Sequence, residues 1–567
     1  MPRWFAIPAL LLALLSVLAY WWAEGRPVPL ADAPATVPCV SYAPYRDGQT
    51  PFDESFVIPR EQIVEDLTLL RGLTRCVRTY TVRQGLDAVP GIARDLGMTV
   101  MLGAWIGLER PKNEKELAAV IDLAQRYPET VSAVIVGNEV LLRREQPPAQ
   151  LAAMIERVRA AVPMPVTYAD VWEFWRKHPE VAAAVDFVTI HVLPYWEDHP
   201  TPVDRAVPYA VETWRQTGDV FAGKRIFIGE AGWPSAGRMR DGARPGRLEQ
   251  ARFVRELMVA AEREGIGINV IESIDQAWKR RLEGTVGGHW GLLDSDRLPK
   301  FPLQGPVSGE PHWLRLFVVS ALIAGLVLAP ALGRPKRLPV AGWLALAAAA
   351  AAAGTLLASG LDDGIDANRT LWDWLVFVIR GLTAVGAAAL VLEVLACRRA
   401  VAPQPIEALL GAARRRQLPS GSWREAALGV LRAVTLFGAT ASSLCLLFDG
   451  RYRDFSTAMH AVPAFALLLL AVAARRPADA AATAPQLATA PDLGEERLLA
   501  VLLAATGLAI ALSEGLANTQ ALAWTGMTLV LAAAVALDYR RLTVAARSWR
   551  SSAIAPSSAP PAAGSGT

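Results

Sequence analysis

Two glutamates at the ends of apolar, β-branched runs are the residues of this chain best placed to do chemistry. Glu139 closes the sequence Val-Gly-Asn-Glu after the run 134–136, and Glu230 closes Ile-Gly-Glu after the run 226–228. An entirely apolar run is typical of a parallel strand buried on both faces, so each carboxylate comes where burial ends. Two carboxylates on one rim can serve as proton donor and nucleophile, the pair that cleaves glycosidic bonds. If only one such run were present, its glutamate would more simply be a solvated residue that begins a helix. The presence of two such runs favours catalysis.

Strand-like and helical segments alternate through residues 37–272, and this alternation must position the glutamates. The strand-like runs are 37–43, 76–80, 99–105, 131–136, 166–169, 187–192, 225–229 and 267–272, and the helical segments are 59–71, 83–95, 114–126, 148–161, 179–184, 204–217 and 246–264. Eight strands in about 270 residues match an α/β fold of the (β/α)8 TIM-barrel type. The alternative is an open doubly wound sheet, but no glycine-rich phosphate loop follows the first strand.

In a barrel of this type, active residues stand at the carboxyl ends of the strands. Besides the two glutamates, the residues predicted there as a sugar-binding ring are Tyr80, Trp105, Asn138, Tyr168, Asp170, His191, Tyr195, Trp233, Trp278 and Lys279. Aromatic rings stack on the apolar faces of sugars, and polar groups pair with their hydroxyls. Any single aromatic could instead pack the barrel rim. Arg78, just before Tyr80, could hydrogen-bond the nucleophile or form a structural ion pair.

Apolar segments long enough to cross a bilayer lie at both sides of the predicted barrel. The chain has 567 residues and a hydrophobic content of 53%, concentrated before residue 24 and after residue 311. The run 4–22 approaches the roughly 20 residues that span a membrane. Seven further candidate segments are 313–333, 339–359, 371–396, 426–447, 457–474, 498–516 and 520–537. We expect the first to be an uncleaved anchor, although Ala31-Asp32-Ala33 offers a cleavage site.

These segments divide the chain into four parts. We predict an N-terminal transmembrane anchor at 1–23, a catalytic barrel domain at 24–311, an all-α polytopic membrane domain at 312–540 and a disordered tail at 541–567. A flexible cytoplasmic loop is expected at 478–491, which is rich in Ala, Pro and Thr.

Arginine-rich loops alternate with acidic loops between the apolar segments. Basic residues follow the second, fourth, sixth and eighth segments, and acidic residues predominate in the other connections. Because basic loops remain on the cytoplasmic side, both termini are predicted to be cytoplasmic. The barrel would then lie in the periplasm, attached to the inner (plasma) membrane and in contact with its lipid.

Charge, histidine and cysteine patterns exclude several other functions. The net charge is only +3, and no basic face with interleaved aromatics points to nucleic acid. The histidines are scattered, so neither a metal site nor a cofactor is expected. Cys39 and Cys76 lie in the first two strand-like runs, where a disulfide and two buried thiols are both compatible with the sequence. Cys397 and Cys445 lie in or beside membrane segments and are expected to act as apolar filler.

The two glutamate blocks resemble the signature blocks of glycoside hydrolase family 17, best known from plant β-1,3-glucanases. These blocks are Val-Gly-Asn-Glu-Val at 136–140 and Ile-Gly-Glu-Ala-Gly-Trp-Pro-Ser at 228–235. The segments 41–45, 77–80, 275–279 and 283–292 look like its bacterial, membrane-attached branch. The resemblance covers about residues 36–300, and the segments 189–195 and 275–279 depart from the plant members.

The resemblance implies a retaining mechanism with the acid on strand four and the nucleophile on strand seven. The strand count places Glu139 and Glu230 on those strands. Glu139 would then be the general acid/base and Glu230 the nucleophile, while Asn138 would hold a sugar 2-hydroxyl. The branch implies a β-1,3-glucan hydrolase or transglycosylase that forms β-1,3 or β-1,6 linkages, with a glucan synthase or export protein as a candidate partner. The alternatives are a non-catalytic glucan sensor and a transporter-associated receptor.

Overall fold

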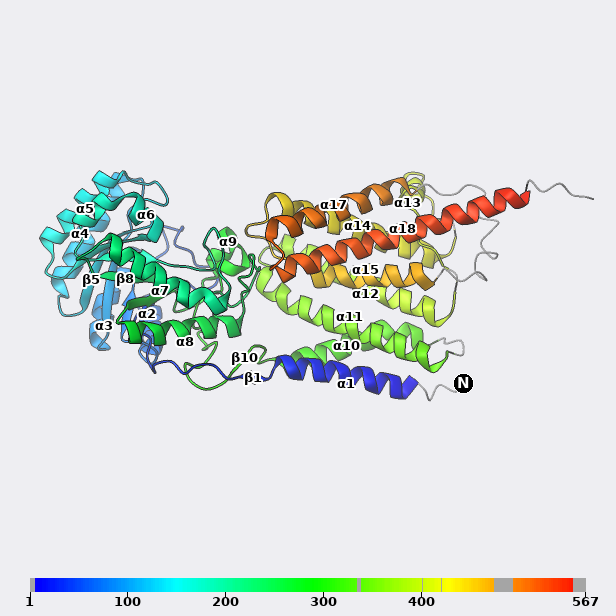
Figure 1. Ribbon diagram of the computed structural model, residues 1–567, viewed down its shortest axis with the longest axis horizontal. Coiled ribbons are helices and arrows are strands. Elements are labelled where there is room, and N and C mark those ends of the chain that lie inside the picture. The colour runs from blue at the N-terminus through cyan, green and yellow to red at the C-terminus, as the bar shows by residue number, and fades with distance from the viewer. Residues whose placement is uncertain (1–5, 334–337, 400, 420, 474–492, 554–567) are drawn as a thin grey trace, which may run out of the picture.

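The computed structural model describes residues 6–333, 338–399, 401–419, 421–473 and 493–553, with side chains up to residue 540 (Figure 1). Eight parallel strands close into a barrel in chain order, which confirms the predicted (β/α)8 fold. The strands are β2 (Val40–Ser41), β3 (Cys76–Arg78), β4 (Thr99–Ala104), β5 (Val131–Asn138), β6 (Val166–Val171), β7 (Val188–His191), β8 (Ile226–Ala231) and β9 (Gly267–Val270). The predicted fourth and seventh strands are β5 and β8.

Helices follow the strands at the predicted places. They are α2 (Arg60–Leu70), α3 (Val89–Asp95), α4 (Arg110–Arg126), α5 (Pro148–Ala161), α7 (Val203–Val220) and α8 (Arg247–Glu264), with 3-10 turns at Leu86–Ala88, Pro179–Ala183 and Ala277–Lys279. Helix α4 begins four residues before the predicted start at 114, since Pro111 suits the first helical turn. Two short helices, α6 (Trp172–Lys177) and α9 (Arg280–Gly287), were not predicted because neither is long enough to show a helical period.

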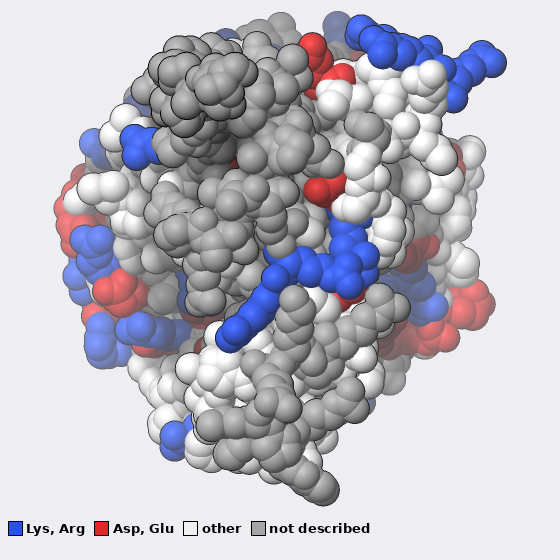
Figure 2. Space-filling model, turned by 90° about the vertical axis from the view of Figure 1, so that its right-hand side faces the viewer, with Lys and Arg blue, Asp and Glu red and all other residues white. Residues whose placement is uncertain are grey.

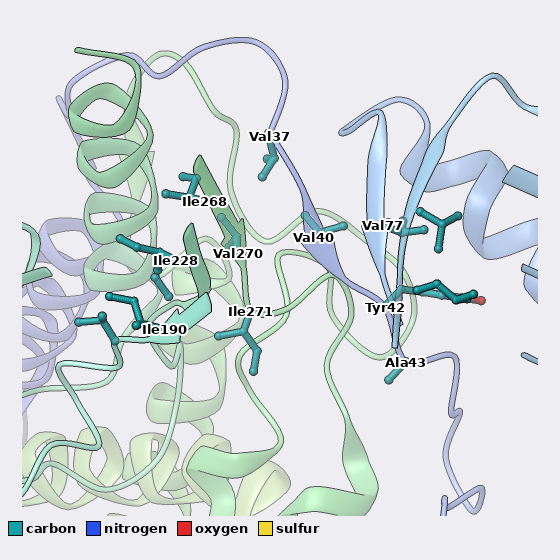
Figure 3. Packing of buried hydrophobic residues seen from close by; sticks show 14 of the residues in the cluster. Val37, Val40, Tyr42, Ala43, Val77, Ile190, Ile228, Ile268, Val270 and Ile271 are labelled. Atoms are coloured by element: carbon teal, nitrogen blue, oxygen red, sulfur yellow. The ribbon is translucent and has the colours of Figure 1, made fainter. Parts of the chain in front are cut away.

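Alternate strand residues separate two apolar clusters of the barrel. Val40, Val77, Ile190 and Ile228 belong to the large cluster, whose strand residues Figure 3 shows from close by and whose other members come from the surrounding helices. A smaller cluster holds the residues at the positions in between, among them Met101, Ile135, Phe187 and Phe227. Because successive strand residues point to opposite faces, the smaller cluster fills the inside of the barrel.

A disulfide joins Cys39, just before β2, to Cys76 at the start of β3. Both cysteines pack with the cluster inside the barrel. The structure thereby decides between the two alternatives that the sequence left open, and it links the first two strands of the barrel.

The rest of the chain forms a bundle of apolar helices, as predicted. Within the described residues, seven helices are long and apolar enough to cross a membrane: α1 (Ala6–Glu24), α10 (Trp313–Leu332), α11 (Val340–Ala367), α12 (Leu371–Ala396), α14 (Trp423–Phe448), α17 (Gly494–Glu514) and the 519–540 part of α18 (Thr519–Ala553). The sixth predicted segment, 457–474, is the shorter apolar helix α15 (Thr457–Ala473). A further short helix, α13 (Ile406–Arg414), precedes α14.

Two boundaries of the predicted parts can be compared with the structure. Helix α18 continues to Ala553, so the backbone of the predicted tail is helical at its start, and residues 554–567 lie outside the described residues. The predicted loop 478–491 also lies outside them.

The N-terminal helix belongs to the bundle. Val17 and Trp21 of α1 pack with Leu316 and Ala358, and Trp21 Nε1 donates to Ser320 Oγ at 2.8 Å. Beside them, β1 (Pro27–Val28) pairs antiparallel with β10 (Val307–Ser308), a small sheet that the sequence did not predict. The two chain segments that connect barrel and bundle therefore run side by side (Figure 1).

Candidate active site

A sharp turn at the end of β5 presents Glu139. Gly137 has φ 89° and Glu139 has φ 54°, both in the left-handed region. A Cβ at position 137 would come within 2.7 Å of Val140 Cγ2, so this turn requires glycine. A non-glycine residue in this region carries strain of about 1–3 kcal/mol, and such strain collects at functional sites.

Glu230 lies on β8 directly beside His191 of β7, with which it is in register. Its side chain is only 6% exposed, whereas that of Glu139 is 24% exposed. Glu230 Oε1 accepts hydrogen bonds from Arg78 at 3.0 Å and from the hydroxyl of Tyr80 at 2.8 Å. The more buried carboxylate thus has two donors fixed on one oxygen.

His191 stands between the two glutamates. Its Nδ1 lies 3.1 Å from Glu139 Oε1, and its Nε2 lies 3.6 Å from Glu230 Oε1. Nearest ligand atoms of the three side chains all lie within 4.8 Å of one another. The carboxyl groups therefore face each other across a short gap, as the roughly 5–5.5 Å pair of retaining glycosidases does.

Arg78 supplies the positive charge beside this group. Its guanidinium is buried, and it donates to Gly229 O at 2.7 Å and to Asn138 Oδ1 at 2.5 Å in addition to Glu230. The hypothesised hydrogen bond between Arg78 and Glu230 is confirmed, and it is also an ion pair. The side chains of Glu139, His191 and Glu230 are close enough together to hold a cation. However, Arg78 lies 3.5 Å from His191 Nε2 and already brings a fixed positive charge to that place.

The environment of Glu139 lowers its pKa in the free protein. Burial acts in the opposite direction, but the hydrogen bond and charge of His191, with the charges of Arg143 and Arg78, outweigh it. For the hydroxyl of Tyr80, burial and the charge of Glu230 raise the pKa well above its usual value, so Tyr80 remains a donor. The geometry does not by itself give Glu139 the high pKa expected of a proton donor.

Lys279 and Trp278 were predicted at the end of the eighth strand, and they lie in the 3-10 turn Ala277–Lys279 that follows β9. Lys279 Nζ donates to Glu272 Oε1 at 2.8 Å, and burial raises the pKa of Glu272 to about 7. Trp278 donates to Gln276 Oε1 at 2.9 Å and meets the rings of Tyr45 and Phe52 edge to face.

Other residues of the predicted ring lie behind the glutamates. Tyr168 and Asp170 are fully buried and hydrogen-bonded to each other, and Asp170 Oδ2 accepts from the amide of Leu141 at 3.2 Å. Burial raises the pKa of Asp170 to about 6. Both side chains therefore support the turn that carries Glu139.

Tyr195 and Trp233 are also fully buried. The hydroxyl of Tyr195 donates to Arg238 O at 2.6 Å, and Trp233 Nε1 donates to Arg244 O at 2.9 Å. Trp105 is half-buried and faces the guanidinium of Arg143 at 4.3 Å. The structure thus brings Tyr80 and His191 directly to the glutamates and Asn138 to Arg78, whereas these three aromatics have other partners.

Two further residues join the site that strand-end reasoning did not single out. Ser41 Oγ accepts from Tyr80 at 2.9 Å and from Asn269 Nδ2 at 2.8 Å. Glu283 lies on α9, where burial and the charges of Glu139 and Glu230 raise its pKa. Both residues occur in segments that resemble the bacterial branch. This resemblance is the feature of the sequence that could have identified them as site residues.

A parallel eight-stranded barrel with two facing carboxylates at its strand ends is the arrangement of glycoside hydrolases. Residues 39–291 of the chain match the family model of the BtgE/BtgC glycoside hydrolase domain. The barrel is thus similar to this glycoside hydrolase domain, in line with the glycoside hydrolase resemblance of its two glutamate blocks.

The chain is also similar to individual proteins of known name. The chain is 27% identical over 263 residues to a glucan 1,3-beta-glucosidase of Schizosaccharomyces pombe, an alignment that covers 43% of this chain and 80% of the relative. It is 26% identical over 267 residues to a Candida albicans protein of the same name, covering 42% and 84%. Among solved structures, a Rhizomucor miehei beta-1,3-glucanosyltransferase mutant in complex with laminaritriose is 25% identical, with a TM-score of 0.42 and coverage of 48% of this chain and 98% of that one.

Proposed function

We propose that the protein is a retaining glycosidase or transglycosylase that acts on β-1,3-glucan, with Glu230 as nucleophile and Glu139 as general acid/base. The observation that carries the proposal is the short gap between these carboxylates, with His191 between them and Arg78 on the nucleophile. The names of the relatives support a β-1,3-glucan as substrate.

Each residue of the site has a role in a double displacement. Arg78 and Tyr80 occupy Oε1 of Glu230, so Oε2 is the oxygen that attacks the anomeric carbon. The bond to the leaving sugar oxygen breaks as Glu139 gives that oxygen its proton. Glu139 then takes a proton from the incoming hydroxyl, which attacks the same carbon and releases Glu230.

The proton on Glu139 depends on substrate. His191 and the arginines favour the ionised form in the free protein. A sugar bound over the glutamates excludes water, and loss of solvation favours the neutral acid. Substrate binding therefore prepares Glu139 to donate, while Arg78 and Tyr80 hydrogen-bond Glu230.

Water or a sugar hydroxyl can resolve the glycosyl-enzyme. Water gives hydrolysis, whereas an oriented sugar hydroxyl gives transfer and a new β-1,3 or β-1,6 linkage. We include both outcomes in the proposed function. The candidate partnership with a glucan synthase or export protein remains a prediction from the resemblance.

The proposed setting is the periplasm, with the bundle in the inner membrane. Figure 2 looks at the end of the molecule opposite the barrel, where Lys and Arg side chains gather. The described connections at this end contain Arg398, Arg399, Arg414, Arg415, Arg416 and Arg424. Basic loops favour the cytoplasmic side, and a disulfide in the barrel suits an oxidising compartment.

The test uses the full chain purified in detergent and incubated with laminarihexaose, with products separated by chromatography and their linkages determined. We expect shorter or longer oligosaccharides from the wild type and none from Glu230→Gln, which should still bind the substrate. Glu249→Gln, which changes a glutamate of helix α8, serves as the control and should remain active. Binding without conversion by the wild type, or full activity of Glu230→Gln, would overturn the proposal.

A further inference from the structure

The carboxyl-end face of the barrel, which carries the glutamates, rests against the near end of the helical bundle. We call the bundle connections 368–370, 449–456 and 515–518 the barrel-side loops. In Figure 1, α9 lies between the barrel and this end of the bundle. Arg280 of α9 donates to Asp366 O at 2.9 Å, and Asn518 Nδ2 donates to Met239 O at 3.1 Å. The bundle therefore meets the site face of the barrel.

The barrel-side loop 449–456 contacts α9 at the kink of this helix, which lies at Gly284. Thr285 Oγ1 donates to Asp454 Oδ2 at 2.5 Å. Gly284 has φ 73°, and a Cβ there would lie 2.4 Å from the carbonyl oxygen of Tyr452. Only glycine permits this close approach of the two backbones, so α9 and the loop are fitted to each other.

Helix α9 links this loop to the catalytic pair. Glu283 is next to Gly284, and burial together with the charges of Glu139 and Glu230 raises its pKa. Despite burial, the pKa of Lys279, just before α9, is raised, and the charge of Glu230 contributes to this shift. The carbonyl of Tyr452 therefore approaches the residue that follows Glu283, and the Tyr452 ring meets Trp196, which lies in the loop after β7.

The ring of Tyr452 is exposed at this place. It is 42% exposed, and it meets the ring of Trp196 edge to face at 6.0 Å. The guanidinium of Arg451 lies 5.6 Å from the Tyr452 ring, and Trp196 in turn stacks on Trp290 at 6.4 Å. An exposed aromatic ring with a cation beside it has the apolar face and polar edge that a sugar requires.

We propose that Tyr452 of the bundle, together with Trp196 of the barrel, forms a distal sugar subsite, so that the membrane-type helices complete the glucan-binding cleft. The inference deepens the proposed function and rests on it. Long glucan chains would reach this subsite beyond Glu283, whereas short oligosaccharides would not. The bundle then selects substrate by chain length in addition to holding the barrel.

The test compares laminaribiose, laminaritriose and laminarihexaose as substrates of the full chain in detergent. Tyr452→Ala should raise KM for laminarihexaose by about 3- to 10-fold, the value of one aromatic stacking contact, and leave kcat and the shortest reactive substrate unchanged. Tyr452→Phe should behave as the wild type because it keeps the ring. Tyr452→Leu keeps bulk without a flat ring and should resemble Tyr452→Ala.

Trp372→Ala is the matched control, because Trp372 is 69% exposed near the barrel-side end of α12. It should leave all KM values unchanged. The inference is overturned if Tyr452→Ala and Tyr452→Leu bind every chain length as the wild type does, or if Trp372→Ala has the same effect. In both cases wild-type turnover with an inactive Glu230→Gln would leave the proposed function standing, whereas a wild type inactive on every length would remove both.

Discussion

His191 determines how charge is distributed between the two glutamates. Its ring nitrogens reach both carboxylates, and Arg78 lies against the same ring. Against the effect of burial, this arrangement lowers the pKa of Glu139 in the free protein. The exposed fraction separates the two roles, since Glu139 is the glutamate that solvent and a leaving sugar can reach.

Removing the imidazole should change the pH dependence of the reaction. In His191→Ala, burial of Glu139 is no longer offset by its largest opposing contribution, so the pKa of Glu139 should rise. A general acid loses activity as pH rises through its pKa. The basic limb of the kcat/KM profile should therefore move to higher pH, although the maximal rate falls. An unchanged limb, or one that moves to lower pH, would contradict this role for His191.

Tyr80 offers a second test at the residue scale. Tyr80→Phe removes a 2.8 Å hydrogen bond to Glu230, and a hydrogen bond to a charged group contributes about 1.5–3 kcal/mol. We expect kcat to fall by about 10-fold or more, measured with laminarihexaose. Tyr127→Phe removes a hydroxyl at the end of α4, before β5, and should leave kcat unchanged. Equal rates for both variants would contradict the assignment.

The turn after β5 depends on elements behind it. Asp170 of β6 accepts from the amides of Leu141 and Leu142, and Tyr168 donates to the same carboxylate. We regard Asp170 as a positioning residue for Glu139.

Substitution of Asp170 should affect catalysis through geometry. Asp170→Ala removes the acceptor and should lower kcat more than it changes KM, because binding contacts remain while the acid is displaced. Asp170→Asn keeps an oxygen for the amides and should restore part of the rate. Steady-state kinetics of both variants decide the matter, and equal losses in both would show that position of the turn is not the cause.

The disulfide should stabilise the barrel through the unfolded chain. Cys39 and Cys76 are 37 residues apart, and closing a loop of that length is worth about 4 kcal/mol in the chain-entropy model. The double variant Cys39→Ser, Cys76→Ser should therefore unfold at a markedly lower temperature by calorimetry. Cys397→Ser, at a cysteine outside this disulfide, is the control. Identical unfolding temperatures for the double variant and the wild type would contradict the expectation.

Elements were predictable where the sequence has a clear period. The apolar runs that became β5 and β8 led directly to Glu139 and Glu230. Helix α9 could not be predicted, because it has only eight residues and Gly284, within the helix, has a non-helical conformation. Tyr195 and Trp233 stand at strand ends in the sequence, and only the packing of neighbouring loops shows that they are buried.

At the scale of the molecule, barrel and bundle behave as one structure rather than as a domain on a tether. Arg238 of the barrel is 4% exposed, pairs with Glu514 of the bundle and donates to Arg453 O at 3.1 Å. The partners Thr285 and Asp454 are 169 residues apart in the chain. No local pattern encodes contacts at such a separation, so the sequence predicts both parts but not their union.

The proposed topology can be tested by cysteine labelling in cells. In a variant lacking Cys397 and Cys445, Ser295→Cys on the exposed barrel surface should react with a membrane-impermeant maleimide. Gln417→Cys, after α13 on the opposite end of the bundle, should react only after the cells are made permeable. The reverse pattern would place the barrel in the cytoplasm.

The central claim is that Glu230 forms a covalent bond to the sugar. The most direct measurement is mass spectrometry of peptides from the full chain after incubation with a 2-deoxy-2-fluoro laminaribiosyl fluoride, which slows release of the intermediate. We predict one added laminaribiosyl group on the peptide that contains Glu230, and none in Glu230→Gln. A label on any other residue, or continued turnover with no labelled peptide, would contradict the account.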